Sequence, residues 1–297
     1  QNPDDYIAPI NVNGLRGRVL HMPAPQGYNR EILLLYGHHA SIERMYGVAE
    51  ALNKYGAITL PDFPGFGGME SFYSIGKKPT LDNMADYLAS FVKMRYKRRR
   101  VTIAAMSFGF VVATRMLQRY PDLAKKVDVL ISIVGFAHRD DFKFHGFSYF
   151  GMRWGASFFS MRLPAAIAQH VFLRGPFIRA AYKLVADNHA KLKDADDTER
   201  RKRIDFEVVL WKINDIRTYM DNAVTMFKLD LCDQRVRLPV WHIAVEPDRY
   251  FDNRIVEQHM KVIFDDVRVI PSEISGGHAP TVVATAQEAK QFIPTKV

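Results

Sequence analysis

Short, nearly continuous apolar runs alternate along the chain with longer segments in which apolar residues recur at helical spacing. The runs occupy residues 31–37, 57–63, 100–106, 127–136, 240–245 and 267–274. Continuous apolar runs of this length predict strands that are buried on both faces, as in a parallel sheet covered by helices.

Helical spacing is found between these runs, at residues 41–56, 80–96, 108–122 and 252–266. Pro121 is expected to close the third of these helices, because a proline inside a helix breaks it. Strands and helices in alternation predict an α/β fold with a mostly parallel central sheet flanked by helices. The N-terminal stretch, which includes NGLRGRVLHM, predicts an additional antiparallel hairpin at the edge of the sheet.

The alternation stops over residues 136–237, where no convincing strand pattern is found. Because loops of such length are uncommon in compact domains, we expect a helical cap inserted into a core domain of residues 1–135 and 238–297. Residues 136–177 hold 11 aromatic residues in 42, more than twice the 12% of the whole chain. These rings either line a pocket or a membrane-facing lid, or form the core of the cap itself. Residues 194–220 predict a charged loop that leads into an amphipathic helix.

Composition and charge restrict the function classes. The net charge of +9 favours anionic partners, but no nucleic-acid motif is found, and the basic run at 93–100 is interpreted as a solvated helix end. No apolar stretch is long enough to predict a membrane span. Cys232 is the sole cysteine, so no internal disulfide forms and a reducing, cytoplasmic location is expected.

One serine lies where a predicted strand ends and a predicted helix begins. Ser107 stands in the pattern Ala105-Met106-Ser107-Phe108-Gly109, close to the G-x-S-x-G nucleophile elbow, whose small residues let strand and helix approach closely. A hydroxyl is a poor nucleophile at neutral pH unless a base takes its proton and a carboxylate orients that base. The chain should therefore supply an acid and a histidine after the serine.

Both groups follow in that order. Asp248 comes directly after the run at 240–245, at the sheet edge where open α/β sheets bind ligands, and is the predicted acid. Asp252 and Glu246 are weaker candidates for the same role. His278 follows the last predicted strand in the turn SGGHAP and is the predicted base.

Acyl transfer also requires donors for an oxyanion. The backbone N–H of Phe108 is one predicted donor, and the backbone N–H of His38, or of its neighbour His39, is the other. Adjacent histidines seldom direct both rings at one ion, and no acidic residue has diagnostic spacing. We therefore expect neither a metal nor another cofactor.

With these motifs the chain resembles the α/β-hydrolase superfamily of capped serine hydrolases, over nearly its whole length. The stretch LPDFPGFGGME at 60–70 is similar to a loop that lies near the active site in that family. The resemblance implies that Ser107 is the nucleophile, Asp248 the orienting acid and His278 the general base. A serine at this position argues against epoxide hydrolase or haloalkane dehalogenase chemistry, which uses an aspartate.

The sequence departs from the family pattern at Ala105, at Tyr36, where histidine is usual, and at Ala40-Ser41 after the histidine pair. These departures bear on the oxyanion loop more than on the triad. Residues expected to contact substrate under the cap are His39, Tyr36, Phe136 and Trp154.

The predicted activity is cleavage of a carboxylic ester in a small, largely apolar substrate, through an acyl-enzyme. The same residues would also serve an amidase, a thioesterase or a carbon–carbon bond hydrolase. The sequence is compatible as well with a noncatalytic or slowly active receptor or scaffold, and with a lipase whose cap makes peripheral membrane contact. Fold analogy does not choose among these functions, and the oligomeric state is left open.

Overall fold

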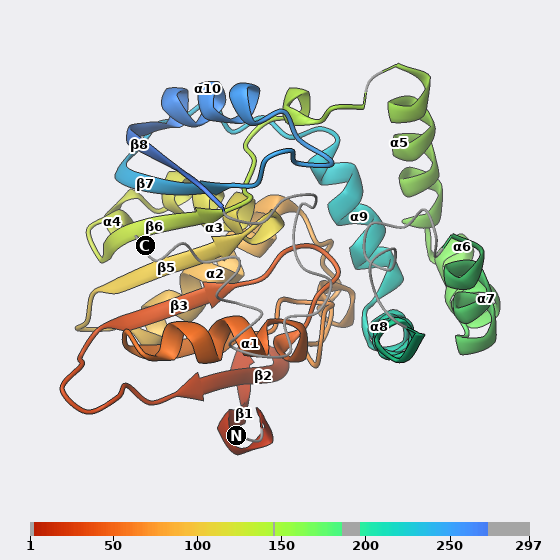
Figure 1. Ribbon diagram of the computed structural model, residues 1–297, viewed down its shortest axis with the longest axis horizontal. Helices are drawn as coiled ribbons and strands as arrows, with labels where there is room; N and C mark the ends of the chain where they lie inside the picture. The colour runs from red at the N-terminus through yellow and green to blue at the C-terminus, as the bar shows by residue number, and fades with distance from the viewer. Residues whose placement is uncertain (1–2, 145, 186–196, 273–297) are drawn as a thin grey trace.

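A single eight-stranded sheet forms the centre of the molecule (Figure 1). The structure is a computed structural model and describes residues 3–144, 146–185 and 197–272. The strand order is β1-β2-β4-β3-β5-β6-β7-β8. The strands are β1 (Ile7–Val12), β2 (Leu15–Met22), β3 (Glu31–Leu35), β4 (Ala57–Pro61), β5 (Val101–Met106), β6 (Val127–Ile133), β7 (Val236–Ala244) and β8 (Phe264–Pro271).

The pairing of these strands confirms the predicted fold class. β1 and β2 form an antiparallel hairpin, and β2 is antiparallel to β4, whereas every other neighbouring pair is parallel. Every residue of β3, β4 and β5 is buried, as expected for central parallel strands with helices on both faces.

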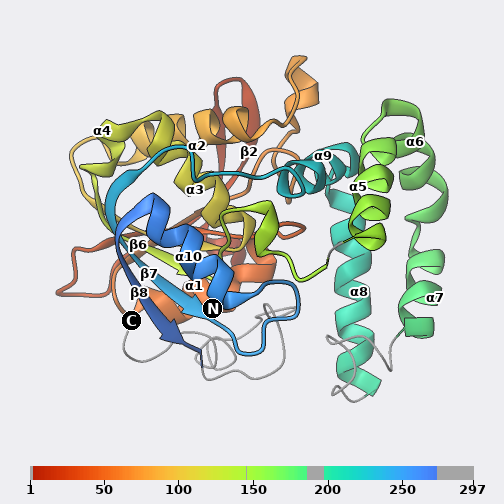
Figure 2. The same cartoon turned by 90° about the horizontal axis from the view of Figure 1, so that it is seen from above.

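Helices cover both faces of the sheet. They are α1 (Ile42–Asn53), α2 (Leu81–Arg95), α3 (Phe108–Arg119), α4 (Pro121–Ala124) and α10 (Asn253–Ile263). The crossover through α1 runs along the sheet in the opposite direction to those through α2 and α3. Because parallel crossovers are right-handed, α1 lies on one face and α2 and α3 on the other (Figure 2).

One predicted helix boundary is confirmed and another is wrong. Pro121 does end α3, since it occupies the first position of α4. The helix predicted to reach residue 266 ends at Ile263, and β8 begins at the next residue. Phe264 is buried and pairs with Val236 of β7, so burial against the sheet overrides the local helical pattern.

Between β6 and β7 the described residues form helices and isolated bridges. The cap helices, as we call them below, are α5 (Phe147–Phe159), α6 (Arg162–Ile167), α7 (Gly175–Val185), α8 (Asp197–Ile213) and α9 (Ile216–Met226); a π-helical turn, η4 (Ala168–Phe172), follows α6. α8 and α9 lie between the sheet and the outer layer of α5, α6 and α7 in both views (Figures 1 and 2).

α8 corrects one prediction, because the charged stretch that was expected to be a loop is helical from Asp197 onward. Its buried positions, Ile204, Glu207 and Leu210, recur every three residues along one side. The first turns of this helix contain no apolar residue, so the sequence shows no helical spacing of apolar residues there.

A buried carboxylate joins the loops at the carboxyl edge of the sheet. Asp62, directly after β4, has no exposed surface. One of its oxygens accepts hydrogen bonds from the Tyr36 hydroxyl and the Ile42 N–H, both at 3.1 Å. The other accepts from Gly68 N–H at 2.9 Å and from the Arg18 guanidinium at 2.8 and 3.0 Å. One side chain therefore ties together β2, β3, α1 and the loop after β4.

We expect Asp62→Ala to lower the free energy of unfolding by about 3–5 kcal/mol, because it leaves buried donors without their acceptor. Asp128→Ala is the matched control, since Asp128 also pairs with an arginine, Arg100, but both side chains are largely exposed. That pair should contribute less than about 1 kcal/mol. Urea unfolding of the two variants measures the difference, and equal losses would contradict the role of Asp62.

Candidate active site

Ser107 occupies a sharp turn between a central strand and a helix. It follows β5, directly precedes α3, and has a φ of 48° and a ψ of −118°. Positive φ is unfavourable for a residue with a side chain, and such strain persists only where the surroundings hold it. Its N–H donates to the Ile133 carbonyl of β6 at 2.9 Å. The strand, turn and helix required of a nucleophile elbow are therefore present.

Two glycines permit this turn. A Cβ at Gly109 would lie 2.4 Å from the Tyr36 carbonyl oxygen, and a Cβ at Gly37 would lie 3.1 Å from the Cβ of Ser107. The start of α3 and the loop after β3 thus approach too closely for larger residues. Ala105, where the motif has glycine, is buried in β5 opposite Ser132, so its methyl group fits within the sheet.

Asp248 lies at the same sheet edge as Ser107. β5, β6 and β7 are parallel neighbours, and Asp248 follows β7 as Ser107 follows β5. The Asp248 side chain is held by its own loop, because Oδ1 accepts from the Tyr250 and Phe251 N–H groups at 2.7 and 3.0 Å. The residue is 3% exposed.

The two weaker candidates for the acid have different contacts. Asp252 caps α10 by accepting from the Arg254 N–H at 3.0 Å. Glu246 is exposed, and its Oε2 accepts from the Asn253 side chain at 2.9 Å. Asp248 is therefore the only one of these three carboxyl residues that is buried.

The predicted base, His278, lies outside the described residues. The described chain leaves β8 at the edge that carries Asp248, because Pro271 pairs with Ala244 at the end of β7. Ser272 N–H donates to the Ala244 carbonyl at 2.7 Å and holds the exit from β8 beside β7.

The predicted oxyanion donors lie on either side of Ser107. Phe108 is the first residue of α3, a position at which the backbone N–H has no acceptor within the helix. The second predicted donor is the backbone N–H of His38, next to Gly37. The His38 ring is turned toward α9: it stacks on Tyr219 at 4.1 Å, and its Nε2 lies 2.9 Å from the Tyr219 carbonyl oxygen. Burial lowers the pKa of His38 to about 3, so the ring is neutral.

His39 belongs to a buried group that joins the core to the cap helices. Its ring packs on Trp211 at 4.1 Å, and its carbonyl accepts from the Arg44 guanidinium at 2.6 Å. Arg44 also forms a buried ion pair with Glu207 of α8, whose second oxygen lies 3.4 Å from His39 Nε2. Both histidines thus contact Tyr219 of α9, and His39 also contacts α8 through Trp211 and Glu207. No group of metal-ligating side chains is found among the described residues.

Three of the side chains expected to contact substrate have other positions. Tyr36 has no exposed surface, and its hydroxyl joins Asp62 to the Phe63 N–H. Phe136 is equally buried and stacks on Phe251 at 4.5 Å. Trp154 is 75% exposed on α5, in the outer helical layer. Tyr36 and Phe136 are therefore packed in the core, where they cannot contact substrate, and Trp154 faces solvent.

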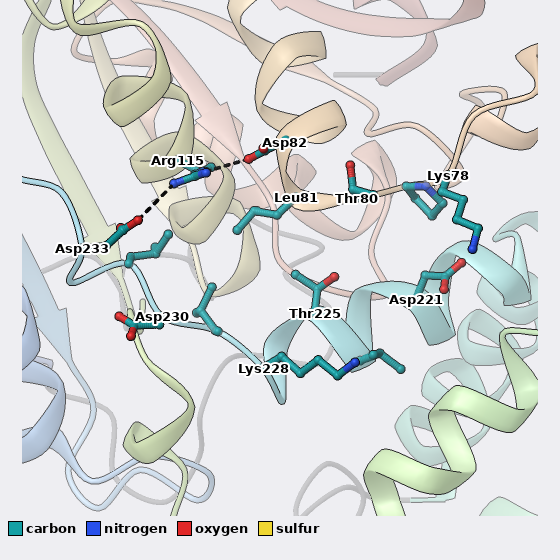
Figure 3. Close-up of a pocket in the computed structure, with 14 residues that line it drawn as sticks. Lys78, Thr80, Leu81, Asp82, Arg115, Asp221, Thr225, Lys228, Asp230 and Asp233 are labelled. Atoms are coloured by element: carbon teal, nitrogen blue, oxygen red, sulfur yellow. Dashed lines mark hydrogen bonds and ion pairs between the residues drawn. The ribbon is translucent and has the colours of Figure 1, made fainter.

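A cavity of about 570 Å³ lies elsewhere, between the start of α2, α3 and α9 (Figure 3). Its wall contains acidic and basic side chains that pair with one another, such as Arg115 with Asp82 at 2.7 Å and with Asp233 at 3.9 Å. None of the predicted site residues lines it. We therefore do not assign the predicted chemistry to this cavity.

The described residues contain a serine–histidine pair that the sequence did not indicate. Ser132 Oγ lies 2.9 Å from His242 Nδ1, across the neighbouring strands β6 and β7. Both residues are almost completely buried, and burial lowers the pKa of His242 to about 4. A pair inside the sheet has no access to substrate, so we interpret it as structural.

Comparison with solved structures places the chain among the α/β-hydrolases in fold. It is similar to an enol-lactonase from Burkholderia xenovorans (TM-score 0.67, 15% identity, 96% of each chain covered) and to an esterase from Exiguobacterium antarcticum (0.65, 14%, 92% of each). It is also similar to an N-formylmaleamic acid deformylase from Pseudomonas putida, with a TM-score of 0.63 and 17% sequence identity over 92% of this chain and 94% of that one. No protein-family model matches the chain, and sequence comparison with curated proteins gives no match. At these identities the likeness establishes the α/β-hydrolase fold.

We expect Gly109→Ala to destabilise the protein by about 2 kcal/mol or more, because the new methyl group overlaps the Tyr36 carbonyl. Gly151→Ala is the matched control: Gly151 lies inside α5 with nothing near its Cβ position. Alanine there should stabilise the helix by about 0.5–1 kcal/mol. Urea unfolding measures both effects, and shifts of the same sign would refute the close approach at the elbow.

Because His242 is buried, we expect the free energy of unfolding to fall at acidic pH. Its pKa is about 4 in the folded protein against an ordinary 6.5, so below pH 6.5 the unfolded chain binds a proton that the folded chain does not. The free energy of unfolding should fall by about 1.4 kcal/mol per pH unit between pH 6.5 and 4 from this residue. His242→Asn should lose that part of the slope in denaturant titrations. An unchanged slope would show that His242 is not held neutral.

Proposed function

We propose that the protein is a serine hydrolase that cleaves a carboxylic ester bond in a small, largely apolar substrate. Ser107 is the nucleophile, His278 the general base and Asp248 the acid that orients it. The observation that carries the proposal is the backbone of Ser107, which has positive φ at the carboxyl end of a central strand and directly precedes a helix. Strain of this kind at a serine is a feature of the nucleophile elbow.

The spacing of the strands supports a relay between the serine and the acid. β5 and β7 are separated by one strand, so their ends lie about 10 Å apart at the usual strand spacing. That distance accommodates an imidazole hydrogen-bonded on both sides. His278 follows the strand next to β7, in the order serine, acid, histidine.

The reaction proceeds in two halves. Ser107 Oγ attacks the ester carbonyl carbon while His278 accepts the hydroxyl proton, and the N–H groups of Phe108 and His38 stabilise the oxyanion. Collapse of the intermediate breaks the ester C–O bond, and His278 protonates the departing alkoxide. Water then attacks the acyl-enzyme with His278 again as base, which releases the carboxylic acid and restores the serine.

A fluorophosphonate probe tests the nucleophile. We expect the probe to label Ser107 in the native chain and to label neither Ser107→Ala nor unfolded protein. Ser132→Ala is the matched control, because Ser132 also has a histidine within hydrogen-bond distance yet is buried in the sheet. Peptide mapping identifies the labelled serine. Labelling that survives Ser107→Ala, or that disappears in Ser132→Ala, would contradict the assignment.

Turnover of short p-nitrophenyl esters tests the reaction class. Ser107→Ala should lower kcat/KM by at least about 10³-fold, and Asp248→Asn by roughly 10²- to 10⁴-fold, while Asp252→Asn should have little effect. Parallel assays with anilide, thioester and β-diketone substrates measure amidase, thioesterase and carbon–carbon bond hydrolase activity. Labelling of Ser107 without turnover of any of these would favour a receptor or scaffold over an enzyme.

A further inference from the structure

The outer layer of the cap helices exposes an unusual amount of apolar surface. Eleven of the seventeen exposed large apolar side chains of the described residues fall within 31 consecutive positions of this layer. Phe147 is 94% exposed, Trp154 75% and Leu163 74%. The outer cap face, as we name it, comprises Phe147, Phe150, Met152, Trp154, Phe158, Met161, Leu163, Ile167, Val171, Phe172 and Phe177.

Most of the large apolar side chains in this layer are exposed, although Tyr149 and Tyr182 pack inward. The buried positions of α5, α6, η4 and α7 are Ala156, Ala165, Ala168 and Ile178. Three of these four buried residues are alanines, whereas Trp154 and most phenylalanines of this layer are exposed. A globular helix buries its largest apolar side chains instead, so this face is suited to a further apolar contact.

The charge of the outer cap face indicates which kind of partner it can bind. Residues 142–185 contain six lysines and arginines and no aspartate or glutamate, which accounts for six of the nine excess positive charges of the chain. Arg153, Arg162 and Arg174 make no ion pair with any described acidic residue. A second copy of the chain would bring like charges together across such a face, which disfavours self-association.

We propose that the outer cap face docks onto the surface of anionic lipid bilayers. Phe147, Trp154 and Leu163 enter the boundary between headgroups and acyl chains, and the arginines contact lipid phosphates. The layer lies farther from the sheet than α8 and α9, so the core does not obstruct a planar partner (Figure 2). No described helix is long and apolar enough to span a membrane.

Co-sedimentation with vesicles tests this surface. The native chain should bind vesicles of phosphatidylcholine with about one-third phosphatidylglycerol at least tenfold more tightly than pure phosphatidylcholine, with weaker binding in high salt. Phe147→Ser/Trp154→Ser should lower the partition coefficient by at least about tenfold. Because both side chains are exposed, the variant should keep the native circular dichroism and unfolding midpoint.

A charge-reversal pair supplies the matched control. Arg153→Glu/Arg162→Glu should lower binding to anionic vesicles by at least about tenfold, whereas Lys97→Glu/Arg98→Glu, in the basic run that follows α2, should change it by less than about twofold. Equal effects of the two pairs would show non-specific attraction by net charge and overturn the proposal. So would equal binding to neutral vesicles, or a stable dimer in sedimentation velocity that Phe147→Ser/Trp154→Ser abolishes.

This surface does not depend on the proposed activity. Ser107→Ala should bind vesicles as the native chain does, and failure of vesicle binding would leave the fluorophosphonate result unaffected. Fluorescence provides a direct readout, since anionic vesicles should shift the emission to the blue in native protein and less in Trp154→Phe. An unchanged emission from native protein would exclude insertion of this ring.

Discussion

The approach of α3 to the end of β3 is the constraint on which the candidate site depends. A glycine at position 109 lets the helix begin against the Tyr36 carbonyl, and the chain must therefore turn through positive φ at Ser107. That turn directs the serine out of the sheet and places the first N–H of α3 beside it. The same approach brings the loop after β3, with His38, against the serine from the other side.

The two histidines after β3 illustrate how the chain departs from its fold family without losing the geometry. Tyr36 takes the place of the usual histidine and donates to the buried Asp62, which fixes the start of the loop. The His38 and His39 rings then contact α9 and α8. The loop that carries the predicted oxyanion donor therefore also packs against these two cap helices. These contacts join α8 and α9 directly to the loop beside Ser107.

Much of the fold could be predicted from the sequence because strands buried on both faces leave continuous apolar runs. The elbow was also visible, since strand, serine and small residues are adjacent in the chain. Contacts between distant residues could not be predicted. Nothing near Tyr36 indicates Asp62, and Ser132 and His242 lie on strands 110 residues apart in sequence. His278 lies beyond the described residues, so its place in the triad stays a prediction.

The cap helices have two faces with different physical chemistry. Toward the core, a buried ion pair between Arg44 and Glu207 and the rings around His38 and His39 give directional contacts that specify one arrangement. Toward solvent, exposed apolar side chains and arginines form a surface that relies on no directional contact. Non-directional apolar attraction and long-range charge are the forces by which a fluid, disordered bilayer is recognised. The directional contacts therefore fix where α8 and α9 lie beside the loop after β3, while the outer cap face is the surface left for the proposed lipid contact.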